Sequence, residues 1–121
     1  MKENEMKDFN GAITYKDKEY KLVFNLNVME TIQEKFGTIE KWGSLTDGSD
    51  RGEPDAKAVI FGFTQMLNEG IDIANEENGT NDPFLTEKQV GRIITEVGLQ
   101  NATQKMNETV IKSTETETKN G

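Results

Sequence analysis

The chain has 121 residues, with 14 Lys and Arg, 22 Asp and Glu, no Cys and no His, and a formal net charge of −8. This length predicts a single domain with a small core. Without Cys or His, the chain has no thiolate nucleophile, imidazole base, disulfide or zinc site of the Cys/His type. The acidic pI of about 4.6 argues against binding to nucleic-acid phosphates, which requires a basic surface.

The first nine residues are charged and lack an apolar segment, so we expect no signal peptide and no export. No apolar run approaches the ~20 residues that a membrane-spanning helix needs. The negative charge is concentrated in residues 44–82, which hold nine acids and two bases. We expect this stretch to be either a solvated surface or a docking surface for a basic partner.

Residues 12–24 predict a β-hairpin. The β-rich segments 12–15 and 20–24 flank a polar turn at residues 16–19. Because an isolated hairpin is marginally stable, it must pack on helices or pair with a partner strand. An unpaired edge would also favour self-association.

A first helix is expected from Asn25 or Asn27, either of which can cap it, to Gly37, which suits a helix end. Residues 38–42 predict one further short turn, with Ile39 and Trp42 pointing inward. The glycine-rich segment 43–53 predicts a mobile loop. It does not fit a calcium-binding loop, because Arg and Ala occupy the fifth and twelfth positions counted from Asp47.

Pro54 is expected to be the first residue of a second helix. Six residues form its predicted core-facing stripe: Ala56, Val59, Ile60, Phe63, Met66 and Leu67. Ala58 and Phe61 lie off this stripe. Phe61 is therefore either covered by the hairpin or the loop, or an anchor in an interface. Gly70 should end or bend the helix, residues 71–74 could add a turn, and residues 75–82 predict a loop.

A third helix should begin at a capping box formed by Thr86 and Gln89, next to a hydrophobic staple of Leu85 and Val90. Its inward stripe is Val90, Ile93, Ile94 and Val97, and Gly98 marks an end or a kink. Residues 99–112 carry a thin apolar stripe and should fray or fold against a partner. Residues 113–121 hold no apolar side chain and predict a disordered tail.

These elements predict an α+β fold, mainly helical, with an N-terminal β-hairpin packed on three to four helices. Residues 1–10 should be a flexible N-terminus, residues 11–112 a single domain, and residues 113–121 the tail. Candidate catalytic carboxylates, such as Glu76 with Glu77, are expected in solvated polar loops, whereas an acid–base pair needs one buried carboxyl group. The sequence predicts no enzyme, and no catalytic, cofactor-binding or metal-binding residue.

Three segments resemble tail assembly chaperones of long-tailed phages and prophages of Gram-positive bacteria. The family begins with a short hairpin, an Asn-rich helix entry and an "apolar-x-x-Ile-x-x-x-Phe-Gly" helix, and a Trp follows shortly after. In this chain the segment 20–37 (YKLVFNLNVMETIQEKFG) has this pattern, and Trp42 follows it. Residues 58–70 are similar to its middle helix and residues 85–90 to its capped third helix. The resemblance covers about residues 11–112 and depends on pattern and order.

The resemblance implies a non-enzymatic chaperone that binds the tape measure protein, keeps it soluble and helps recruit tail tube subunits. A longer product of a −1 ribosomal frameshift would contact the tail tube protein. Both forms would act in the host bacterial cytoplasm and be absent from the mature virion, without nucleic acid, membrane or cofactor. The codons of residues 118–120 could form a slippery site, although Lys-Asn is common in AT-rich genes.

From the apolar patterning, we expect partner contacts at Phe61, Met106, Val110 and Ile111, and a homo-oligomer is a further expectation. Two other functions fit the acidic, non-enzymatic composition. One is a DNA mimic that inhibits a host DNA-binding protein, which would require carboxylates spaced like phosphates along one face. The other is a structural tail-completion protein, which would be present in virions.

Overall fold

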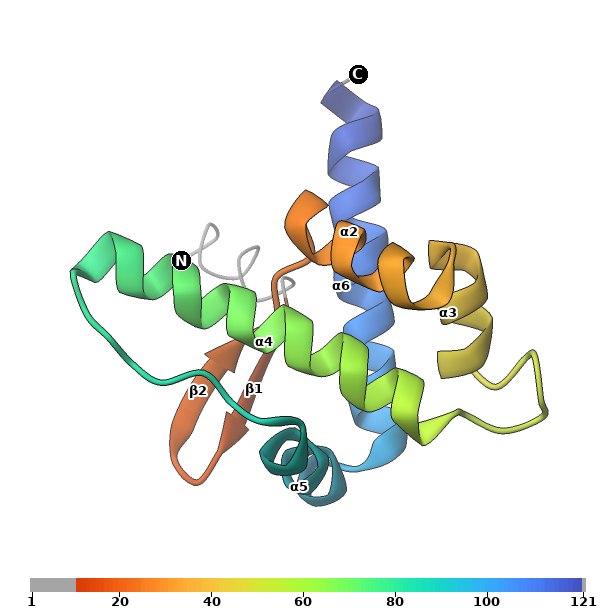
Figure 1. The fold of residues 1–121 in the computed structure, drawn as a ribbon, viewed down its shortest axis with the longest axis horizontal. Coiled ribbons are helices and arrows are strands. Elements are labelled where there is room, and N and C mark those ends of the chain that lie inside the picture. The colour runs from red at the N-terminus through yellow and green to blue at the C-terminus, as the bar shows by residue number, and fades with distance from the viewer. Residues whose placement is uncertain (1–10, 121) are drawn as a thin grey trace.

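The computed structural model describes the backbone of residues 11–120 and the side chains of residues 11–114. Within this range the chain forms a two-stranded antiparallel sheet and five helices. Figure 1 shows α4 crossing the middle of the molecule, with the hairpin and α5 on one side, α2 and α3 on the other, and α6 running behind it. The fold is therefore α+β and mainly helical, as the sequence predicts.

The hairpin consists of β1 (Ala12–Tyr15) and β2 (Lys18–Lys21), and the first residue of β1 pairs with the last of β2. Its turn has two residues, Lys16 and Asp17, with φ of 51° and 64°. Two consecutive positive φ angles are typical of a type I′ turn, whose twist matches that of the strands. The predicted turn over residues 16–19 is therefore too long, because residues 18 and 19 already pair across the sheet.

The hairpin is attached to α4 (Ala56–Asn78) through backbone groups. The N–H of Val23 donates to the carbonyl oxygen of Met66 over 3.2 Å. A Cβ atom at Gly70 would lie 2.7 Å from the carbonyl oxygen of Lys21, so only glycine permits this close approach. Gly70 does not end the helix: α4 continues through residues 71–74, as the sequence allowed, and on to Asn78. The predicted loop at 75–82 accordingly begins only after this residue.

Two capped helices follow the hairpin. Asn25 caps α2 (Leu26–Phe36) by accepting from a backbone N–H of the first turn, and Gly37 ends it with φ of 95°. Thr38 caps α3 (Ile39–Thr46). α3 extends past the predicted short turn into the predicted loop 43–53, because its last two residues are buried and gain from helical packing.

Asp55 caps α4, so Pro54 precedes the helix and is not its first residue, contrary to the prediction. The predicted core stripe is also shifted: Ala56 is exposed, whereas Ala58 is fully buried. The cause is Trp42 of α3, whose Nε1 donates to the carbonyl oxygen of Ala58 over 3.1 Å. A Cβ atom at Gly62 would overlap the Trp42 ring, so Ala58 and Gly62 form a notch that accepts the indole.

α5 (Glu87–Val97) begins at the predicted capping box, and Val90, Ile93 and Ile94 are buried as expected. α6 (Leu99–Asn120) contributes Ala102 and Met106 to the core.

The Ser113 hydroxyl donates to the carbonyl oxygen of Phe24, so the packed part of α6 reaches at least one residue beyond the predicted domain limit. The side chains of residues 115–121 and all of residues 1–10 lie outside the described residues. The predicted flexible N-terminus and disordered tail therefore stay predictions.

Candidate partner-binding surface

An extended segment, residues 79–86, lies along the C-terminal half of α4, and we call it the strap. The side-chain amide of Asn68 pairs with the backbone of Leu85 in both directions, with N···O distances of 3.0 and 2.8 Å. Asn75 makes the same two-way pairing with the backbone of Asp82, at 3.1 and 2.9 Å. Two asparagine side chains thus hold the strap as a strand would be held in a sheet.

The spacing of these residues explains why the pairing fits. Asn68 and Asn75 are two helical turns apart, which at 1.5 Å per residue is about 10 Å along the helix. Asp82 and Leu85 are three extended residues apart, which at about 3.3 Å per residue is also about 10 Å. The strap therefore runs antiparallel to α4, in register with the turns that carry Asn68 and Asn75, and Gly79, with φ of 66°, makes the reversal.

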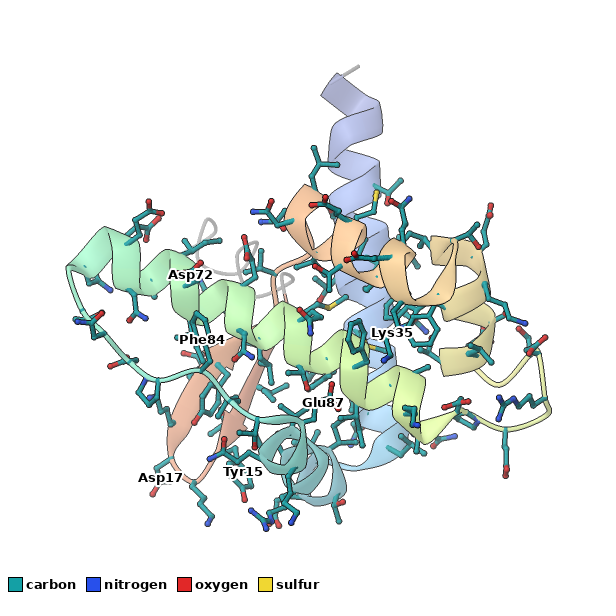
Figure 2. All side chains as sticks on the ribbon, in the orientation of Figure 1. Tyr15, Asp17, Lys35, Asp72, Phe84 and Glu87 are labelled. Carbon is teal, nitrogen blue, oxygen red and sulfur yellow. The ribbon has the colours of Figure 1, made fainter. Side chains whose placement is uncertain are left out.

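The strap presents Phe84 on the molecular surface. Its side chain is 55% exposed, although burial of a phenylalanine is worth about 1.5–3 kcal/mol. Figure 2 shows Phe84 beside α4, near Asp72. Phe84 borders a hollow of about 220 Å³ between α2, α4 and the strap, lined also by Val28, Thr31, Asn68, Glu69 and Asp72.

Glu69 joins the two helices that wall this hollow. Its Oε2 accepts from Nδ2 of Asn25 over 2.8 Å and from Nδ2 of Asn27 over 3.2 Å. Neither Glu69 nor Asp72 has a Lys or Arg partner among residues 11–114, where the ion pairs present are Lys41–Asp50 and Arg51–Asp55. The hollow therefore combines an exposed aromatic ring with a carboxylate held in place by two amides.

The four residues expected to bind a partner lie in different environments. Phe61 is half-buried and packs edge-to-face on Phe36, with ring centroids 5.7 Å apart. The Nζ of Lys35 lies 5.1 Å from the Phe61 ring. Phe61 thus packs on the end of α2, which the sequence analysis had not expected, and its role as an interface anchor stays a prediction.

The other three residues lie on α6. Met106 is completely buried in the core, so it is not available to a partner in this arrangement. Val110 is half-buried against the core, and Ile111 is 55% exposed. Of the four, Ile111 is the exposed one.

Sequence reasoning missed Phe84, which belongs to no periodic stripe. It also missed the exposed Leu26, whose side chain is 73% accessible at the start of α2. The available signal was Asn68 and Asn75 at a spacing of seven, followed by Pro83, which favours extended backbone at the residue before it. This combination indicates a helix face that holds an extended segment.

The loop between α3 and α4 contains one perturbed carboxyl group. The backbone N–H and the hydroxyl of Ser49 act on Asp47 as hydrogen-bond donors and lower the pKa of its carboxyl below the ordinary value of 3.8. Within the described part of the chain, no group of three or more Asp or Glu side chains is placed to hold a metal ion. No helix in that part is long and apolar enough to cross a membrane.

No family model matches this chain, and neither does any curated protein or solved structure.

Proposed function

We propose that this protein is a non-enzymatic phage tail assembly chaperone, which binds the tape measure protein, keeps it soluble and helps recruit tail tube subunits. The observation that carries the proposal is the resemblance across residues 11–112, above all in the segment 20–37 with Trp42 after it. The hairpin, the Asn25-capped helix ending at Gly37 and the third helix with its capping box are the elements that this family would have.

The surface is compatible with an escort for an apolar helical protein. A tape measure chain exposes apolar stripes until the tail tube encloses it, so its escort needs apolar contact points and high solubility. Four large apolar side chains are exposed in the described residues: Leu26, Phe84, Leu99 and Ile111. A net charge of −8 keeps such a protein soluble.

In this proposal the short chain and a longer frameshifted form both contact the tape measure protein, and the longer form brings the tail tube protein. They act in the host cytoplasm and leave before the virion matures. Self-association along the tape measure protein, as a homo-oligomer, is part of the proposal.

Intact-mass and peptide analysis of phage-producing cells and of purified virions tests this function. We expect a longer species in cells that shares this N-terminal sequence and diverges near Lys119, with neither species in virions. Finding the 121-residue form inside virions would overturn the proposal in favour of a structural tail-completion protein. The short form alone, in cells only, would favour the DNA mimic, which competition with DNA for a basic protein would then test.

A further inference from the structure

The hollow beneath Phe84 has the size of one or two side chains. Its volume of about 220 Å³ is below the range of about 300–1,000 Å³ that holds small-molecule ligands. Its floor includes the buried Val28, and its rim is the exposed ring of Phe84. Such a hollow suits an apolar side chain that projects from a partner.

The backbone on both sides of Phe84 is held in position before any partner binds. Both backbone hydrogen-bonding groups of its neighbour Leu85 are taken by Asn68, and Asp82 two residues earlier is held by Asn75. A ring on a fixed backbone loses little conformational entropy on contact, which is the property of an interface anchor.

The charge around the hollow selects a basic occupant. Residues 58–87 contain six acids, and no Lys or Arg. Two of these acids, Glu69 and Asp72, line the hollow, and no basic side chain lines it. The Oε2 atom of Glu69 is fixed by Asn25 and Asn27, while within the described residues its Oε1 makes no hydrogen bond.

A second hollow of the same volume shows the contrast. It lies between the end of the hairpin and α6, and its lining includes Lys21, Lys112 and the buried Phe24. The two hollows thus have the same volume, while the charged side chains that line them have opposite signs. A basic partner would therefore select the hollow beneath Phe84.

We infer that the hollow between α2, α4 and the strap docks a helical partner segment that carries an apolar side chain one turn from a Lys or Arg. The apolar side chain packs between Phe84 and Val28, and the basic group reaches Glu69 and Asp72. This inference deepens the proposed function and rests on it, since it takes the partner to be a helix escorted by this chain.

Titration of the full-length ¹⁵N-labelled protein with synthetic peptides tests the inference. The probe is an amphipathic helical peptide with Leu and Arg four residues apart, and its control has Gln in place of each Arg. We expect the Arg peptide to shift the side-chain amide signals of Asn25, Asn27 and Asn68 and the backbone signal of Phe84. The Gln peptide should bind about tenfold more weakly, and added salt should weaken only the Arg peptide.

Matched variants distinguish binding at the hollow beneath Phe84 from binding elsewhere on the surface. Phe84→Ala should weaken binding of the Arg peptide about tenfold, whereas Ile111→Ala, which removes an equally exposed apolar side chain, should leave it unchanged. Asp72→Asn should weaken binding about threefold, whereas Asp17→Asn at the hairpin turn should not change it (Figure 2).

Equal binding of the Arg and Gln peptides would overturn the inference, and so would unchanged binding by Phe84→Ala. Shifts centred on residues 21–24 and 113 would overturn it as well, because they would place the peptide in the other hollow. Capture of the tape measure protein is measured separately. If the Phe84→Ala variant still captures the tape measure protein, the inference about the hollow fails and the proposed function stands. If the wild type binds the Arg peptide but not the tape measure protein, the proposed function fails, while the hollow still binds a basic helical segment.

Discussion

Two segments are attached to α4 in opposite ways. α3 is attached by Trp42, which is 1% exposed and fills the notch at Ala58 and Gly62. The strap is attached by the side-chain amides of Asn68 and Asn75, close to solvent. Burial of a large apolar group contributes more to stability than exchange of water hydrogen bonds for protein ones. The first junction therefore stabilises the fold, while the second fixes the position of a surface residue.

The largest expected effect is at the α3 junction. Trp42→Ala should lower the free energy of unfolding by about 3–5 kcal/mol, because it leaves a large cavity in a small core. Urea unfolding followed by circular dichroism measures this change. Leu26→Ala is the control, since a side chain that is 73% exposed should contribute less than about 0.5 kcal/mol. Similar losses in the two variants would contradict the importance of the junction.

The notch itself should be sensitive to a single methyl group. Gly62→Ala should destabilise the protein by about 1–3 kcal/mol, because the added Cβ overlaps the buried Trp42 ring. Gly43→Ala is the matched control, since Gly43 is helical and a Cβ there meets nothing within 4 Å. That variant should gain up to about 1 kcal/mol from helix propensity. The same thermal-unfolding scan measures both, and opposite signs are the expected result.

The strap junction should give a smaller and more local effect. Asn68→Ala removes two partly buried hydrogen bonds and should cost about 1–2 kcal/mol. Hydrogen exchange at the amide of Leu85 should accelerate, whereas amides of α3 should change little. Asn75→Ala removes hydrogen bonds that are exposed and should cost less. Unchanged protection at Leu85 in Asn68→Ala would contradict the role of the asparagine pairing.

The smallest effect concerns pH in the loop between α3 and α4. The pKa of Asp47 is lowered in the folded state, first by the backbone N–H of Ser49 and then by its hydroxyl. Its contribution to stability is therefore present above the unfolded value near 3.8 and is lost as the pH falls through the lower folded value. An NMR titration of the carboxyl signal should show a midpoint below 3.8. Ser49→Ala should raise this midpoint only in part, since the backbone donor remains.

Local signals in the sequence were sufficient for several elements. The capping box at Thr86 and Gln89 was predicted, and the cap of α2 was narrowed to Asn25 or Asn27, of which the structure has Asn25, because each cap depends on neighbours three residues away. Gly70 and Ala58 were misjudged because their roles depend on residues far along the chain. The glycine faces the carbonyl oxygen of Lys21, and the alanine lies under Trp42.

The candidate site was less predictable than the fold. Met106 reads as a sparse apolar residue on a polar helix, yet it is completely buried in the core. Phe84 reads as part of a loop, yet Asn68 holds the next residue and leaves the ring exposed. Exposure depends on what surrounds a residue in space, and periodicity reports only one helix at a time.

By itself the sequence determined the fold class, the capping box of α5, the absence of Cys and His chemistry and the acidic charge of the middle of the chain. These properties depend on composition or on contacts within a few residues. The tertiary structure decided which small residues admit Trp42, where α4 ends, and which apolar side chains reach the surface. Such features depend on contacts between segments that are far apart in the chain. One contact, between Ser113 and Phe24, joins residues about ninety positions apart. Only the folded chain brings such segments within contact distance.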